Sequence, residues 1–83
     1  MITKICELDD IPEYLISRGI FRSYKKAKRL LISGYGSAVD FKIRQPKNKG
    51  YYQFRINKKY RAFGYFEAPG ELVVFEVSDH QDF

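Results

Sequence analysis

Residues 51–66, YYQFRINKKYRAFGYF, decide the fold class of this chain. At the start of this stretch every second residue belongs to an apolar set, which is the period of a β-strand with one covered face; the set is Tyr52, Phe54 and Ile56. The polar run at 57–59 predicts a turn, and Tyr60–Phe66 predicts a second strand. The stretch therefore predicts a β-hairpin whose strands carry both aromatic and basic residues.

The sequence on both sides extends this hairpin into a sheet. Downstream, residues 68–71 (APGE) predict a type II turn, because Gly follows Pro at the position that needs a positive φ angle. Residues 72–77 then predict another strand. Upstream, residues 46–50 predict a loop, and residues 37–44 predict a strand because its apolar residues alternate with polar ones: Val39, Phe41 and Ile43. We expect an antiparallel sheet of about four strands, and residues 2–8 fit a short first strand.

Two short helices are predicted before the sheet. Residues 10–13 (DIPE) have the pattern of a capping box, with a carboxylate at the cap and Pro in the first turn, and Gly19 ends this helix. A second helix is expected to begin after Ser23 and to end at residues 33–34. The apolar faces are Ile11, Tyr14 and Leu15 in the first helix and Tyr24, Ala27, Leu30 and Leu31 in the second. Because short helices need packing to be stable, we expect an α+β fold with two N-terminal helices on one face of the sheet.

Length and composition exclude several classes of protein. A chain of 83 residues is expected to form a single domain over residues 1–83. One Cys and one His exclude an internal disulfide framework and a structural zinc site, and no metal or other cofactor is expected. The apolar runs are far shorter than the roughly 20 residues that cross a bilayer. The first residues do not resemble a secretory signal, so a cytoplasmic protein without membrane contact is expected.

The charged residues are strongly segregated along the chain. Residues 1–17 carry a net charge of −3, residues 18–66 carry +13 and residues 67–83 carry −5, which together give the formal charge of +5. The central segment holds fourteen bases and a single acid, Asp40. A surface of this kind favours a polyanion such as RNA or DNA as partner. The alternative is that these side chains only solvate exposed faces and pair with the acidic ends of the chain.

The predicted sheet collects several of these bases on one side. If the helices cover one face, then Lys42, Arg44, Gln53 and Arg55 point to the open one. Seven aromatic residues lie between 51 and 66 and alternate with bases, a combination that suits single-stranded nucleic acid. Strands also favour aromatic residues for packing alone, so we expect only two or three of the seven to be exposed. The candidate RNA-binding residues are Lys42, Arg44, Lys47, Lys49, Lys58, Lys59 and Tyr52.

His80 has the one side chain whose ordinary pKa lies near neutral pH. It follows the last predicted strand and is flanked by Asp79 and Asp82. A histidine beside a carboxylate can transfer a proton at pH 7. A lone histidine near a terminus is more often a plain surface residue, and the spacing leaves both interpretations open.

Two segments resemble one known family. GYYQFRINKKYRAFGY at 50–65 and ELVVFEVSDH at 71–80 are similar to the RelE/ParE superfamily, the toxins of bacterial toxin–antitoxin pairs. Two features are especially similar to the HigB-like and YoeB-like branches. One is the sequence Arg55-Ile56-Asn57, followed after two residues by Tyr60 and Arg61, and the other is a His just after the final strand. The resemblance covers residues 37–83 by motif and the N-terminal half by the order of its elements.

The resemblance implies a fold and an activity. Members of these branches are small, basic, metal-independent endoribonucleases that cut messenger RNA in the ribosomal decoding site, and a cognate antitoxin silences them. By this resemblance Arg61 stabilises the phosphate, His80 is the general acid and Arg55 is a supporting cation. Asp79 either accepts the proton of the attacking 2′-hydroxyl or orients His80. The implied partners are the antitoxin, whose acidic segment would cover the basic surface, and the ribosome with its mRNA.

The chain departs from the family pattern at two places. Where one branch has a Glu base before a Pro, this chain has Gln45-Pro46, and an amide does not accept a proton at neutral pH. Where a Tyr often follows the His or closes the tail, this chain has Gln81 and Phe83. The alternative prediction is therefore a non-catalytic RelE/ParE-fold binding protein, either directed at DNA gyrase or degenerate.

Overall fold

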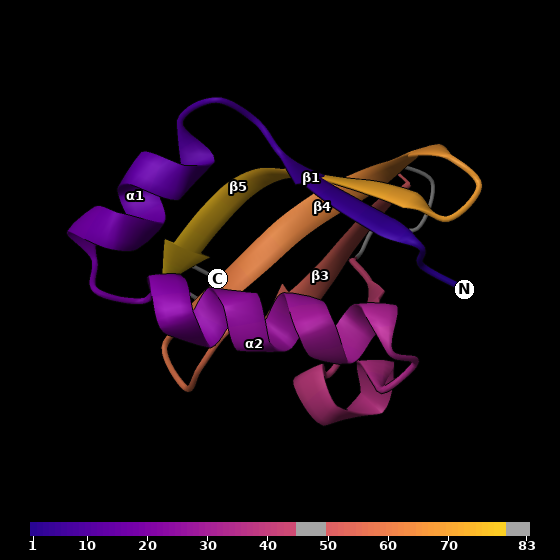
Figure 1. Ribbon diagram of the computed structural model, residues 1–83, viewed down its shortest axis with the longest axis horizontal. Helices are drawn as coiled ribbons and strands as arrows, with labels where there is room; N and C mark the ends of the chain where they lie inside the picture. The colour runs from indigo at the N-terminus through magenta and orange to yellow at the C-terminus, as the bar shows by residue number, and fades with distance from the viewer. Residues whose placement is uncertain (45–49, 80–83) are drawn as a thin grey trace.

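The computed structural model describes residues 1–44 and 50–79, which form an α+β layer (Figure 1). Its elements are β1 (Lys4–Glu7), α1 (Ile11–Ser17), α2 (Phe21–Ile32), the 3₁₀ helix η1 (Gly36–Val39), β2 (Lys42–Ile43), β3 (Tyr51–Arg55), β4 (Tyr60–Ala68) and β5 (Glu71–Asp79). The five strands lie in the order β1-β5-β4-β3-β2. The predicted α+β fold and its short first strand are confirmed. The sheet is mixed, however, because β1 runs parallel to β5 while the other pairs are antiparallel.

Both helices pack their apolar sides on the same face of the sheet. Figure 1 shows α2 in front of the strands with α1 beside it. The core cluster joins the helices to residues of β1, β3, β4 and β5. Its helical members include Ile11, Leu15, Tyr24, Ala27 and Leu31, and its strand members include Ile5, Phe54, Ala62, Leu72, Val74 and Val77. The other face of the sheet, which we call the open face, is turned away from α1 and α2.

The helix boundaries differ from the prediction in two details. The first helix lies where it was predicted, but Asp10 has a helical φ of −87° and its side chain makes no capping hydrogen bond, so the predicted capping box is absent. The second helix begins at Phe21, earlier than predicted. It can begin there because Gly19, at a φ of +71°, reverses the chain and Ile20 is buried at the helix start.

The strand predicted over residues 37–44 is largely wrong. Residues 36–39 form η1 instead, Asp40 follows in the left-handed region at a φ of +53°, and β2 is limited to Lys42–Ile43. The apolar residues of the pattern still pack against the protein. Val39 is buried although it lies in a helical turn, and Phe41 stacks on Tyr52 with ring centroids 5.4 Å apart. The same alternation of apolar residues is therefore compatible with two backbone conformations, a strand and a 3₁₀ helix followed by a short strand.

A β-bulge in β5 decides which of its side chains face the core. Phe63 pairs with Glu76 and Gly64 pairs with Val74, so Phe75 is the extra residue. The bulge lets Val74 and Val77 both join the core although they are three residues apart. Gly64 is required beside it, because a Cβ at this position would lie 2.7 Å from the carbonyl oxygen of Val73.

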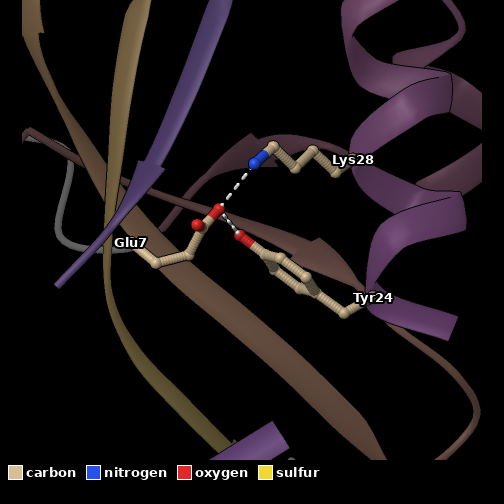
Figure 2. A network of polar contacts seen from close by, with 3 residues as sticks. All are labelled: Glu7, Tyr24 and Lys28. Atoms are coloured by element: carbon tan, nitrogen blue, oxygen red, sulfur yellow. Dashed lines mark hydrogen bonds and ion pairs between the residues drawn. The ribbon is translucent and has the colours of Figure 1, made fainter. Parts of the chain in front are cut away.

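Three polar side chains tie β1 to α2 (Figure 2). The Tyr24 hydroxyl donates a hydrogen bond of 2.6 Å to Glu7 Oε2, and the Lys28 ammonium lies 2.9 Å from the same oxygen. Burial of Tyr24, together with the Glu7 carboxylate, raises the pKa of its phenol well above the ordinary value. The contact gives the buried hydroxyl its acceptor and holds the first strand against the second helix.

We predict that Glu7→Ala destabilises the fold by about 1–3 kcal/mol, because it leaves the buried Tyr24 hydroxyl without an acceptor. The measurement is the free energy of unfolding in urea. Lys28→Gln, which removes a partly exposed ion pair, should cost less than about 1 kcal/mol. Equal stability of Glu7→Ala and the wild type would contradict a structural role for this contact.

Candidate functional site

The open face carries two arginines that lie opposite each other on neighbouring strands. Arg55 on β3 pairs with Arg61 on β4, and Arg61 pairs in turn with Ser78 on β5. Paired residues point to the same side of a sheet. These three residues, which we call the arginine row, therefore form a line across three strands on one face. Adjacent guanidinium groups repel each other unless an anion lies between them, and a phosphate group has the charge and the oxygens to do so.

The hairpin turn between β3 and β4 holds Arg61 in place. The side-chain oxygen of Asn57 accepts hydrogen bonds of 2.8 Å from the backbone N–H groups of Lys59 and Tyr60, which closes the turn. The Arg61 guanidinium Nη1 donates 3.1 Å to the Asn57 carbonyl oxygen and 3.4 Å to that of Tyr60. Asn57, which the sequence marked as part of a motif, thus acts through the backbone by shaping the turn that orients Arg61.

Aromatic side chains cover the next part of the open face. The Phe75 ring lies 5.0 Å from Tyr51 and 5.9 Å from Tyr65, measured between ring centroids. Between this group and the arginine row, Phe63 is fully buried and the Arg44 guanidinium lies 4.3 Å from the centre of its ring. We call Tyr51, Tyr65 and Phe75 the aromatic row. Rings beside guanidinium groups can stack on bases while the cations contact phosphates.

Glu76 is a carboxylate on this face that sequence reasoning missed. It pairs with Phe63 on β4, and it precedes by two residues Ser78, which is the partner of Arg61. Strict alternation from Leu72 and Val74 would turn Glu76 toward the core, but the bulge at Phe75 turns it to the open face, where it is exposed. The sequence does contain a signal for this bulge: the apolar residues Val74 and Val77 are three positions apart, whereas a regular strand would place them two apart.

The residues that strand alternation assigned to the open face lie on it. Lys42, Arg44, Gln53 and Arg55 belong to the open face, since Lys42 pairs with Gln53 and the Arg44 N–H donates to the Tyr51 carbonyl oxygen. Lys58 and Lys59 lie in the turn beside the arginine row, and both are exposed. Of the seven aromatic residues in 51–66, Tyr51 at 39% and Phe66 at 36% are exposed, which confirms the expected number.

Two predicted residues lie away from the arginine row. Tyr52 pairs with Gly64 and stacks on Phe41, so it belongs to the helix-covered face, and Tyr51 takes its place on the open one. Asp79 pairs with Tyr60, so strand alternation directs it to the face opposite Arg61, and its Oδ2 lies 3.8 Å from Lys59 Nζ. His80, Lys47 and Lys49 lie outside the described residues, as do Gln45, Pro46, Gln81 and Phe83.

Residues 1–44 and 50–79 contain no group of three His, Cys, Asp or Glu side chains that could hold a metal ion. None of the helices in these ranges is both long and apolar enough to cross a membrane. Comparison with known proteins finds no matching family model and no significantly similar curated protein. The chemistry of the open face therefore has to be inferred from its own residues.

Proposed function

We propose that the protein is the toxin of a type II toxin–antitoxin system and acts as a ribosome-dependent mRNA endonuclease that inhibits translation. The observation that carries the proposal is the pairing of Arg55 with Arg61 on the open face. Both arginines belong to the segment that resembles the RelE/ParE superfamily. They lie on the same face as the aromatic row, in which Tyr51 is exposed and Tyr65 and Phe75 are half-buried. Cations and rings on one face suit a single-stranded RNA substrate.

The proposed reaction is attack of a 2′-hydroxyl on its own phosphodiester, which needs no metal ion or cofactor. The bond from the 2′-oxygen to phosphorus forms while the bond to the 5′-oxygen breaks, and negative charge grows on the remaining phosphate oxygens. Arg61, with Arg55 beside it, stabilises that charge. The Glu76 carboxylate takes the proton of the 2′-hydroxyl. His80, by the resemblance, gives a proton to the leaving 5′-oxygen.

Glu76 suits the proton-accepting role better than Asp79. It shares the open face with Arg61, whereas Asp79 is directed away from it and lies next to Lys59. This assignment also supplies a base in a chain that has Gln45 where one branch of the family has a glutamate. Asp79 is then left with the second role considered for it, that of orienting His80.

The partners follow from the charge of the same face. The ribosome and its mRNA supply phosphates, and the aromatic row supplies stacking surfaces for unpaired bases. The cognate antitoxin would silence the protein by covering this face with an acidic segment. Such a protein works in the cytoplasm, where translation takes place.

Controlled expression in a bacterial host, followed by primer extension on a translated message, tests the proposal. Cleavage within codons that stops when the start codon of the message is removed is the expected result. Growth arrest without any cleavage would instead support the alternative, a non-catalytic RelE/ParE-fold binder that acts on gyrase or another protein. The observation that favours this alternative is the direction of Asp79 away from Arg61.

We predict that Glu76→Gln lowers the rate of cleavage about 10²-fold, because the amide keeps the shape of the side chain but does not accept the proton. The measurement is single-turnover cleavage of mRNA on purified ribosomes. Glu67→Gln removes the charge of an exposed carboxylate elsewhere on the sheet and should leave the rate unchanged. A wild-type rate for Glu76→Gln would exclude it as the base.

A further inference from the structure

The outer surface of α2 carries four cations in one continuous stripe. Arg22, Lys25, Lys26 and Arg29, which we call the α2 stripe, are all exposed. Their spacing of i, i+3, i+4 and i+7 places them on one side of a helix, within a sector of about 100° and along about 10 Å of its axis. The buried residues of α2, which are Tyr24, Ala27 and Leu31, lie on the opposite side.

The charge of the α2 stripe is not neutralised within the described part of the protein. The helix contains no acidic residue. Its one ion pair among the described residues joins Lys28, which lies outside the stripe, to Glu7. The pairs Arg22–Lys26 and Lys25–Arg29 place like charges one turn apart, an arrangement that weakens a helix. A phosphate backbone bound along the stripe would remove this repulsion.

A hollow beside α2 lies between the α2 stripe and one residue of the arginine row. A hollow of about 300 Å³ lies between α2 and the end of β3, and its lining includes Lys26 from the helix and Arg55 from the strand. Arg55 lies beyond the short β2, whose pairing with β3 stops at Gln53. Lys26 of the stripe and Arg55 of the arginine row thus line the same hollow, and Arg55 pairs in turn with Arg61.

We propose that the α2 stripe is a second RNA-binding surface, which contacts the phosphate backbone of double-stranded ribosomal RNA while the open face holds the single-stranded message. This inference rests on the proposed function. The stripe itself consists of four cations. Two apolar residues border it: Phe21, whose ring centroid is 5.1 Å from Lys25 Nζ, and the exposed Ile32. Phe21 is half-buried under Lys25 and Ile32 is a single aliphatic side chain, so the stripe has neither a row of rings for stacking bases nor the cluster of apolar anchors that dominates protein interfaces. Contacts of long cationic side chains with phosphates suit a folded RNA helix.

The test compares Lys26→Gln and Arg29→Gln with Lys4→Gln, an exposed lysine on β1. Each variant removes one positive charge, and Gln has nearly the same helix propensity as Lys and Arg, so the fold is preserved. The probe is a blunt RNA duplex of about 16 base pairs. At about 0.15 M salt each α2 variant should bind it roughly fivefold more weakly than the wild type and lower the salt slope by about one. Lys4→Gln should change neither quantity appreciably.

Equal affinity of the α2 variants and Lys4→Gln for the duplex would overturn the inference. So would displacement of the duplex by a polyglutamate peptide at a lower concentration than by unlabelled RNA, because an acidic protein would then be the better partner. Cleavage on ribosomes separates this inference from the proposed function. The α2 variants should need more ribosomes for half-maximal cleavage but reach the wild-type rate at saturation. A wild-type protein that never cleaves would refute the nuclease and leave the duplex measurement to decide on the stripe.

Discussion

Arg61→Gln should lower the rate of mRNA cleavage on ribosomes about 10³-fold, which is the upper end of the effect of removing one donor to a developing negative charge. The guanidinium is half-buried and is oriented by two carbonyl oxygens of the hairpin turn. Arg61 also pairs with Arg55 on the neighbouring strand, so we expect a phosphate at this point to meet both cations. Gln keeps one hydrogen-bond donor group, but it lacks the positive charge and the pair of parallel N–H donors with which a guanidinium binds a phosphate. Single-turnover cleavage with saturating ribosomes measures the effect on the chemical step.

Two companion variants show whether the loss belongs to catalysis. Arg61→Lys keeps the charge without the planar fork, and it should recover part of the rate. His80→Gln should also abolish cleavage if the imidazole is the acid. Circular dichroism and urea unfolding must show that each variant is folded. Cleavage at the wild-type rate by folded Arg61→Gln and folded His80→Gln would exclude the proposed mechanism.

The sequence predicted the sheet well where alternation and turn signals agree. In the β3–β4 hairpin the period-two pattern, the Asn57 turn and the aromatic strand residues all favour one structure. Residues 36–44 lack such agreement, because the same apolar positions can be buried by η1 followed by a short β2. The parallel pairing of β1 with β5 was not predictable from local pattern either. This pairing depends on how α1 and α2 pack on the sheet, because the chain passes through both helices between β1 and the other strands.

The candidate site was predicted in part for the same reason. Arg55 was assigned to the open face by strand alternation, whereas Arg61 was named only through the family resemblance. The pairing of β3 with β4 places both on the same face. Tyr52 was assigned to RNA although its alternation with Gln53 places it on the covered face. Glu76 was missed because the bulge at Phe75 changes the alternation within β5, and a bulge depends on the packing of neighbouring strands.

Phe54→Ala should lower the free energy of unfolding by about 3–5 kcal/mol, the usual loss for a large aromatic residue in a core. Phe54 is 1% exposed, and its ring centroid lies 6.1 Å from that of Tyr24, so it joins the middle of β3 to α2. Small domains have only about 5–15 kcal/mol in total. The variant should therefore unfold at a much lower urea concentration, or fail to fold at physiological temperature.

Tyr51→Ala is the matched control, because the same strand presents this aromatic residue to the other face. Tyr51 is 39% exposed and contacts Phe75 on the open face. Its removal should cost only about 1 kcal/mol of stability. It should weaken binding of a single-stranded RNA by roughly tenfold, however, because a stacking surface for a base is lost. A Tyr51→Ala protein that binds single-stranded RNA like the wild type would show that the aromatic row serves packing alone. In that case the phosphate contacts of the arginine row would have to account for all the affinity of the open face.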